Sequence, residues 1–193
     1  YAQPTVNSSR VFLSPPRYIQ GPGVIRNCGL YLQLINANNV AVLASKRGFS
    51  AEASDVLASL SKEGIAHSKA EFLGECSREE VERHANNLMS SKLDCILAVG
   101  GGKLVDAGKC IAHRLNCQVV IIPTLASNDA PCSSISVLYT SDGVKDLVEY
   151  FPQNPAFVIV DTEVIVNASE RYLVAGMGDA MATWYEARVC EDN

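Results

Sequence analysis

Three glycines followed by a lysine, Gly100 to Lys103, are the clearest place in the sequence where the backbone itself could bind a ligand. They stand between an apolar run, residues 94–99 (DCILAV), and a segment whose apolar residues have helical spacing. Glycines allow a ligand to approach the backbone closely, and a helix N-terminus offers free N–H groups and a partial positive charge. This combination suits a pyrophosphate; a tight strand-to-helix turn without a ligand is the alternative.

The glycine segment matches neither standard nucleotide-binding fingerprint. A P-loop requires glycine where Leu97 stands and a hydroxyl residue where Leu104 stands, and the dinucleotide fingerprint requires glycine or alanine in place of Val105. The case for phosphate binding therefore rests on the glycines and the helix N-terminus alone, and not on a known fingerprint.

A second polar segment, residues 123–133 (PTLASNDAPCS), follows another apolar run. It would lie at the carboxyl edge of a parallel sheet, where open α/β sheets bind ligands. It is rich in hydroxyls and carries one carboxylate, Asp129, between two prolines. The segment is either part of a ligand site or a loop held by bonds from its own side chains to the backbone.

A third candidate is Asp179, within residues 176–184 (GMGDAMATW). We expect it in the first turn of a helix, where the helix dipole keeps a carboxylate ionised and where most such residues are simple caps. The neighbouring Trp184, Tyr185 and methionines are expected in the core. His67, His84 and His113 have no metal-binding spacing, so each is expected on a helix surface or in a loop.

The elements that must position these residues alternate between strand and helix. Apolar runs at residues 40–44, 65–72, 94–99, 118–123 and 157–160 predict strands, and helical patterns lie between several of them. Residues 135–140 and 144–151 predict a hairpin with its turn at Asp142-Gly143. This order predicts an α/β fold with a Rossmann-like, mostly parallel sheet.

After residue 161 the strand patterns stop, and residues 169–175 and 179–189 predict two helices. We therefore expect a nucleotide-binding α/β domain over residues 1–161 and the beginning of a helical metal-binding domain over residues 162–193. Because the last helical pattern reaches the end of the chain without a terminating signal, the protein is expected to continue for more than a hundred helical residues.

Composition narrows the class of partner. The formal net charge of −5 argues against nucleic acid, and the sequence has neither a basic block for an anionic membrane nor an apolar run long enough to span one. Seven cysteines without a C-x-x-C pair indicate a reducing compartment. We expect the protein to be located in the cytoplasm, or in the mitochondrial matrix if a leader preceded Tyr1.

The ordered set of motifs resembles the iron-containing alcohol dehydrogenase family, in particular its polyol-oxidising members. The resemblance covers nearly the whole chain. It rests on residues 10–15 (RVFLSP), 18–21 (YIQG), 100–106 (GGGK-x-x-D), 123–131 (P-T-x-A-S-x-D-A-P), 136–139 (SVLY), 154–155 (NP), 160–162 (VDT) and 178–184 (GDAMATW).

The resemblance implies a role for each matching residue. Those expected to contact NAD are Gly100, Gly101, Gly102, Lys103, Asp106, Thr124, Ser127, Ser133, Ile135 and Tyr139. Asp129 matches the carboxylate that meets the substrate, and Asp179 matches the first ligand of a catalytic metal. The family's two further metal ligands are histidines of the later helical domain.

The activity implied is hydride transfer from glycerol or a related polyol to NAD, which gives dihydroxyacetone from glycerol. A divalent metal, zinc before iron, would act as a Lewis acid on the substrate hydroxyls. The expected assembly is a homo-oligomer. Alternatives are the related glycerol-1-phosphate dehydrogenase and dehydroquinate synthase, or a nucleotide-binding module without catalysis if the chain is complete.

One departure from the family pattern concerns cofactor choice. After the strand at residues 40–44 this chain has Ser45-Lys46-Arg47 where an acid is expected to pair with the adenosine ribose hydroxyls. The two cations favour tolerance of NADP beside NAD.

Overall fold

The computed structural model describes residues 12–140 and 142–192. Arg10 and Val11, where the resemblance begins, and Ser141 beside the expected hairpin turn lie outside these residues.

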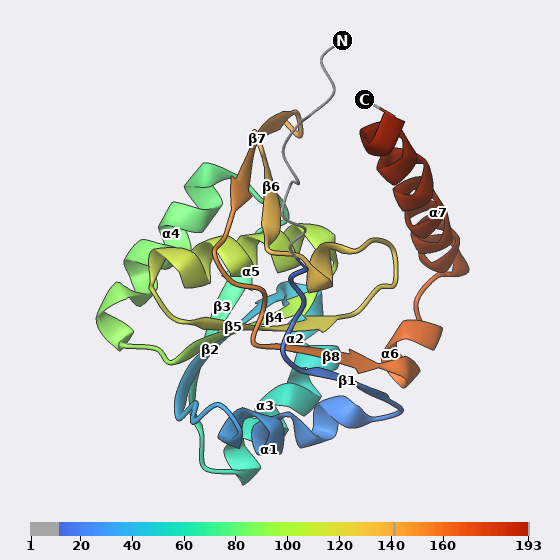
Figure 1. Cartoon of the computed structure of the whole chain (residues 1–193). Coiled ribbons are helices and arrows are strands. Elements are labelled where there is room, and N and C mark those ends of the chain that lie inside the picture. Colours follow the sequence, from blue (N-terminus) through green and yellow to red (C-terminus); the bar gives the residue numbers. More distant parts are fainter. Residues whose placement is uncertain (1–11, 141, 193) are drawn as a thin grey trace.

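A six-stranded sheet in the order β1-β8-β5-β4-β2-β3 forms the centre of the molecule (Figure 1). Every neighbouring pair in it is parallel. Its strands are β1 (Tyr18–Gly21), β2 (Asn39–Ser45), β3 (Ala66–Phe72), β4 (Cys95–Gly100), β5 (Gln118–Pro123) and β8 (Phe157–Asp161). The inner strands β2 and β4 are apolar without alternation because helices cover both faces of the sheet. The predicted α/β class and parallel sheet are confirmed.

The two faces of the sheet have separate apolar cores. On one face lie η1 (Val24–Asn27), α1 (Cys28–Gln33) and α3 (Glu52–Lys62), packed over Val42 and Leu97. On the other lie α4 (Arg78–Leu88) and α5 (Gly102–Arg114), packed over Leu43 and Ile96, and the exposed η2 (Met89–Ser91) follows α4. Gly108 permits the close approach of α5 to β4, because a Cβ at this position would lie 2.5 Å from the Cβ of Ala98.

Local capping agrees with the sequence at two helices. The Ser77 hydroxyl accepts a hydrogen bond from the Glu80 N–H at 3.2 Å and starts α4 as expected. Ser45 does the same for the short α2 (Lys46–Phe49), accepting from the Gly48 N–H at 3.1 Å. The second of these caps fixes the chain at the carboxyl end of β2.

The predicted hairpin forms a separate antiparallel sheet of β6 (Ile135–Tyr139) and β7 (Lys145–Tyr150). Gly143 has a φ of +82°, a conformation that favours glycine. The hairpin stands against α5, where the Arg114 guanidinium forms a bidentate ion pair with Glu149 at 2.6 and 2.7 Å. The hairpin therefore lies on the same side of the sheet as α5, the helix that begins at the glycine segment.

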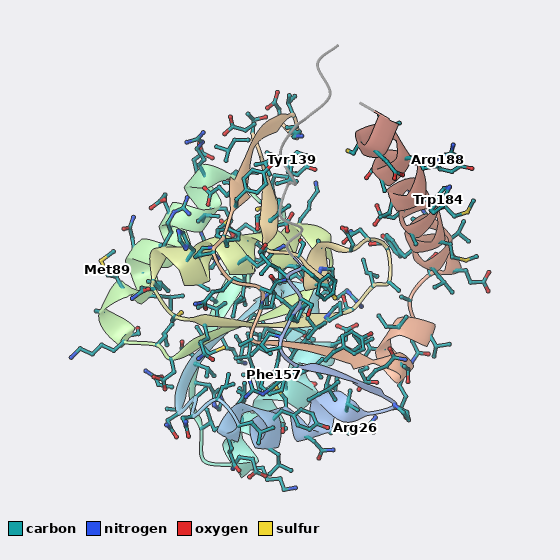
Figure 2. The ribbon with its side chains drawn as sticks, viewed as in Figure 1. Arg26, Met89, Tyr139, Phe157, Trp184 and Arg188 are labelled. Atoms are coloured by element: carbon teal, nitrogen blue, oxygen red, sulfur yellow. The ribbon has the colours of Figure 1, made fainter. Side chains whose placement is uncertain are left out.

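The end of the described chain corrects three expectations. A single helix, α7 (Glu170–Asp192), follows the short α6 (Thr162–Val166) and replaces the two predicted helices, because Gly176 and Gly178 are tolerated within it. Asp179 consequently lies in the middle of a helix and not in its first turn. Trp184 is 64% exposed on α7 instead of lying in the core, in contrast to Phe157 in the sheet (Figure 2).

Other large side chains of α7 are exposed as well: Tyr185, Met177 and Met181 are each more than 60% exposed.

In the part of the chain that the structure describes, no helix combines the length and apolarity needed to cross a bilayer.

Two histidines also differ from expectation. His84 is 3% exposed on α4, where its Nε2 lies 3.2 Å from Glu80 Oε1 and 2.9 Å from the Arg83 guanidinium. Burial and the neighbouring Arg83 lower the pKa of His84. His67 lies in β3. A buried histidine satisfied by its own helix gives no pattern that separates it from a surface one, which is why the sequence misplaced it.

The N-terminal elements β1, η1 and α1 were not predicted either. They are short, and part of what holds them is distant in sequence: the Asp161 carboxylate accepts hydrogen bonds from the Gly23 N–H at 3.0 Å and the Ile25 N–H at 3.2 Å. The same carboxylate caps α6 through the Glu163 N–H.

Candidate active site at the carboxyl edge of the sheet

The glycine segment forms the turn between β4 and α5. Gly100 ends the strand and Gly101 is the N-cap residue of α5, where it provides no capping side chain. The first N–H groups of α5 are therefore left for a ligand or water. This is the arrangement that binds a phosphate at a helix N-terminus.

Neighbouring side chains also leave little room for a side chain at Gly101 or Gly102. A Cβ at Gly101 would lie 2.9 Å from Leu125 Cδ1, and one at Gly102 would lie 2.7 Å from Asn128 Nδ2. The polar loop after β5 thus lies directly over the start of α5. The two segments selected from the sequence, although separated along the chain, are adjacent in space.

A cavity of about 1130 Å³ opens at this edge of the sheet. It is lined at the carboxyl ends of β2, β4, β5 and β8, by Ser45, Gly100, Thr124 and Asp161 among others. Its position agrees with the rule that open parallel sheets bind ligands outside the carboxyl ends of their strands. Its size is sufficient for a dinucleotide.

Six of the predicted cofactor residues line this cavity: Gly100, Gly101, Gly102, Lys103, Thr124 and Ser127. Of the others, Asp106, Ser133 and Ile135 lie around Lys109 and Tyr139 lies near Lys103. Asp129, on the loop after β5, contacts Asp179 of α7. Sequence reasoning therefore selected one connected region that has two distinct parts.

Lys103 has an acidic partner that the sequence did not suggest. Its ammonium lies 2.6 Å from Glu75 Oε2 and 5.8 Å from the centroid of the Tyr139 ring. The contact with the ring brings together two predicted residues, Lys103 and Tyr139. Glu75 comes from the loop before α4, and no local pattern links it to the glycine segment.

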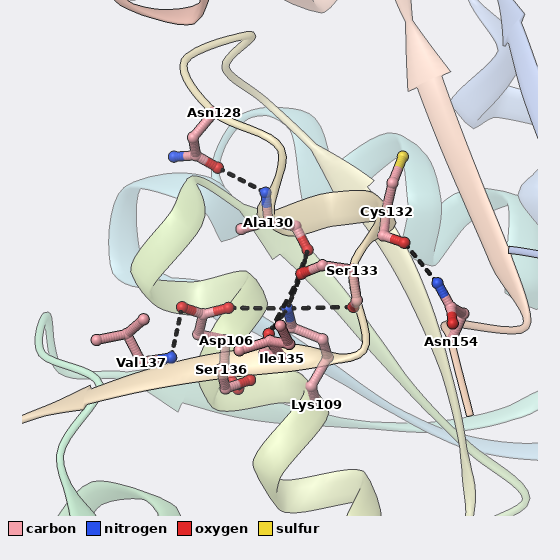
Figure 3. A network of polar contacts seen from close by, with 10 residues as sticks. All are labelled: Asp106, Lys109, Asn128, Ala130, Cys132, Ser133, Ile135, Ser136, Val137 and Asn154. Atoms are coloured by element: carbon pink, nitrogen blue, oxygen red, sulfur yellow. Dashed lines mark hydrogen bonds and ion pairs between the residues drawn. The ribbon is translucent and has the colours of Figure 1, made fainter. Parts of the chain in front are cut away.

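Asp106 is not among the residues that line the cavity and lies in a buried polar network (Figure 3). Its Oδ1 lies 2.9 Å from the Lys109 ammonium, and its Oδ2 accepts a hydrogen bond from the Val137 N–H at 3.1 Å. Burial raises the pKa of the Asp106 carboxyl, and the Lys109 ammonium acts in the opposite direction. Ser133 and Ile135 lie around the same ammonium.

Lys109 is the functional candidate that the sequence reasoning missed. Its spacing of three residues from Asp106 on a helix was the available signal.

The two predicted catalytic residues meet at the far end of the polar loop, through the backbone of Asp129 and the carboxylate of Asp179. The Asp129 N–H donates a hydrogen bond to Asp179 Oδ2 at 3.1 Å, although the residues are 50 apart in the chain. Gly176 makes this approach possible, because a Cβ there would lie only 2.1 Å from the Ala126 carbonyl oxygen. The third sequence motif thus contacts the second.

The described residues do not contain a complete metal site. Within residues 12–140 and 142–192 no group of three or more His, Cys, Asp and Glu side chains comes together as metal ligands would. A divalent ion held by protein ordinarily takes at least three such ligands. Asp179 is compatible with one ligand position.

The end of β2 differs from what the sequence alone suggested. Arg47 forms an ion pair with Glu52 of α3, with 2.9 Å between Nη2 and Oε1, and both residues line the cavity. The Glu52 side chain is 18% exposed whereas that of Arg47 is 76% exposed. A carboxylate therefore stands beside Arg47, and it comes from the helix that follows.

Comparison with known proteins gives a consistent result. The model of one protein family, described as iron-containing alcohol dehydrogenase, matches residues 15–162. A glycerol dehydrogenase of Escherichia coli O6:H1 is 42% identical over 181 residues, which are 94% of this chain and 49% of that protein. A glycolaldehyde reductase of Halobacterium salinarum is 37% identical over 92% of this chain and 48% of that protein.

Among solved structures, the crystal structure of glycerol dehydrogenase from Schizosaccharomyces pombe superimposes with a TM-score of 0.86 at 37% identity. The match covers 92% of this chain and 45% of that one. The chain spans about half the length of the curated relatives it matches.

Proposed function

The chain belongs to the iron-containing alcohol dehydrogenase family, and from that premise we propose that it is the nucleotide-binding part of an NAD-linked, metal-dependent glycerol dehydrogenase. The observation that carries the proposal is the contact between two parts of the fold. An uncapped glycine turn beside a large cavity lies under the same loop that carries Asp129 to Asp179.

The cofactor is proposed to lie along the carboxyl edge of the sheet. The N–H groups at the start of α5 would hold its pyrophosphate, and Lys103 would add a positive charge there. Thr124 and Ser127, which line the cavity, would supply further polar contacts. The close-packed glycines support this assignment, since any side chain at Gly101 or Gly102 would meet the loop above them.

The substrate is proposed to bind where Asp129 and Asp179 approach each other. Asp129 would accept hydrogen bonds from polyol hydroxyls and orient the carbon that loses hydride toward the nicotinamide. Alignment of this kind is a large part of catalysis in hydride transfer, because the redox chemistry belongs to the cofactor. Glycerol is proposed first because relatives bearing that name are similar over most of the chain.

Asp179 is proposed as one metal ligand, with histidines from the remainder of the protein as the others. When bound, the metal would supply Lewis acidity that lowers the pKa of a substrate hydroxyl. A carboxylate with two imidazoles suits either zinc or iron, and zinc is proposed first. A homo-oligomer in the cytoplasm or mitochondrial matrix completes the proposal.

Cofactor choice is proposed to be NAD with measurable use of NADP. Ser45 at the end of β2 carries no charge to repel a 2'-phosphate, and Arg47 is sufficiently exposed to reach one. Glu52 limits the use of NADP, because its carboxylate already pairs with Arg47.

The direct test is NADH formation by the protein as its gene encodes it, with glycerol, propane-1,2-diol and glycerol-1-phosphate as substrates. We expect turnover of the two unphosphorylated polyols. Asp129→Asn should abolish most of it while leaving NADH binding intact. The exposed hairpin-turn variant Asp142→Asn serves as the matched control and should behave as wild type. Turnover of glycerol-1-phosphate alone, or NADH binding without any polyol oxidation, would contradict the proposal.

A further inference from the structure

Lys109 is a charged residue for which the proposed reaction has no use, yet the fold buries it. It lies about two turns into α5 and is only 3% exposed. An ammonium group removed from water is destabilising unless ionic or hydrogen-bonding partners replace the lost hydration. The identity of those partners therefore indicates what Lys109 does.

The partners come from two different segments (Figure 3). The ammonium lies 2.9 Å from Asp106 Oδ1 on its own helix and donates to the carbonyl oxygens of Ala130, at 2.9 Å, and of Ile135. Ser133 presents its hydroxyl and carbonyl oxygens at 3.4 and 3.5 Å. The three N–H groups of the ammonium therefore have a carboxylate beside them and backbone and hydroxyl oxygens of residues 130–135 as acceptors.

Asp106 fastens the same two segments from the other side. Its Oδ2 accepts from the Val137 N–H at 3.1 Å, and its backbone carbonyl accepts from the Ser136 hydroxyl at 3.0 Å. Residues 130–137 are thus tied to α5 through both members of the buried ion pair. Neutralisation of Asp106 alone would not require Lys109 to bind carbonyls of η3 (Ala130–Cys132) and β6 as well.

The tied segment, residues 130–137, begins directly after the proposed substrate residue Asp129. The Ala130 N–H donates a hydrogen bond to Asn128 Oδ1 at 3.1 Å. Asn128 in turn lies over Gly102 at the first turn of α5. The helix that begins at the cofactor cradle therefore also holds, farther along, the loop that presents Asp129 to Asp179.

We propose that Lys109 is a positioning residue that fixes the Asp129 loop relative to the cofactor cradle. This inference rests on the proposed function, since Asp129 is taken to meet the polyol. Lys109 touches neither substrate nor cofactor; it acts by holding Ala130 and Ile135 against α5. The consequence is that loss of its donors misaligns the substrate while the cradle stays intact.

The experiment compares Lys109→Met, Lys109→Arg and Lys109→Gln in the protein as its gene encodes it, with Lys62→Met at the exposed end of α3 as the control. In Lys109→Met we expect kcat with glycerol to fall about 100-fold, as small misplacements of reacting groups do. We expect KM for glycerol to rise. The Kd for NADH should change by less than about threefold, because most residues expected to contact NAD line the cavity outside the segment that Lys109 holds. Arg and Gln variants, which keep N–H donors, should recover part of kcat.

Hydrogen exchange measured by mass spectrometry provides the readout that a purely structural role would not give. Peptides covering residues 128–137 should exchange faster in Lys109→Met, whereas those covering β4 and α5 should keep their protection. If Lys109→Met does not fold, the same comparison is made with Lys109→Gln, which retains two donors.

Two results would overturn the inference. One is a folded Lys109 variant with wild-type loop exchange and wild-type kcat. The other is loss of NADH binding together with thermal stability in every variant, since Lys109 would then only neutralise Asp106. If the wild-type protein oxidises no polyol, the proposed function fails, and the exchange measurement still decides whether Lys109 fixes the loop.

Discussion

Replacing Gly176 by alanine is expected to separate Asp129 from Asp179, the two residues that the fold brings together. Gly176 of α7 lies against the loop after β5, where a Cβ would lie 2.1 Å from Ala126 O and 3.0 Å from Ala126 C. Both atoms belong to the backbone and cannot rotate away. The clash must therefore be relieved by movement of α7 or of the loop.

The size of that movement follows from the distances. Ordinary contact for a Cβ begins at 3.4 Å, so the two segments must separate by roughly 1 Å, and a misplacement of that size can lower a rate about 100-fold. The hydrogen bond from the Asp129 N–H to Asp179, at 3.1 Å, cannot survive such a shift with good geometry. Glycerol oxidation should fall accordingly.

Gly178 provides a matched control on the same helix. An added Cβ there meets nothing within 4 Å, so Gly178→Ala gains the helix propensity of alanine, about 1 kcal/mol, without a clash. In Gly176→Ala the same gain opposes the cost of overpacking, about 1–3 kcal/mol. We expect Gly178→Ala to raise the Tm and Gly176→Ala to leave it unchanged or lower it.

The assay is steady-state NADH formation with glycerol, with NADH affinity and Tm measured on both variants. Gly176→Ala should lose turnover and keep NADH affinity, because the cradle lies on α5. Equal turnover in the two alanine variants would refute the argument that contact between α7 and the loop sets the geometry of the proposed site.

Three further outcomes are expected. Asp179→Asn should reduce the bound metal and lower turnover by orders of magnitude while NADH affinity is retained, as metal analysis and fluorescence titration would show; normal metal content with normal turnover would return Asp179 to a structural role. Ser45→Asp should keep the cap of α2 but lower kcat/KM with NADP relative to NAD, because the added carboxylate repels a 2'-phosphate; identical cofactor ratios in both proteins would remove the reason for selecting this position. Burial raises the pKa of the Cys28 thiol to about 12 and that of Cys95 well above its usual value, so iodoacetamide at pH 8 should label both only after denaturation; equal labelling of the native protein, detected by mass spectrometry, would contradict their burial.

The sequence by itself determined the parts of the molecule that depend on neighbouring residues. Apolar runs without alternation located β2, β4 and β5 because a strand covered on both faces needs apolar residues at every position. Ser77 located the start of α4 through its cap. The uninterrupted Gly100 to Gly102 located the turn between β4 and α5, since it breaks a strand where a helix begins.

The resemblance to a known family added the roles expected of each residue. The structure brings these residues into one region around the carboxyl edge of the sheet. It does establish that Asp129 and Asp179 are neighbours, which neither periodicity nor composition could have shown.

Only the tertiary structure decided the contacts between distant segments. The pair of glycines in α7 resembled a helix break, but Gly176 is there because another part of the chain passes 2.1 Å from where its Cβ would be. His84 was expected on a helix surface or in a loop and is buried, and Lys109, which was not selected from the sequence, is buried among its partners. Glu75 reaches Lys103 from a different loop. Each of these depends on atoms brought together by folding, and local sequence patterns carry no record of which distant residues will supply them.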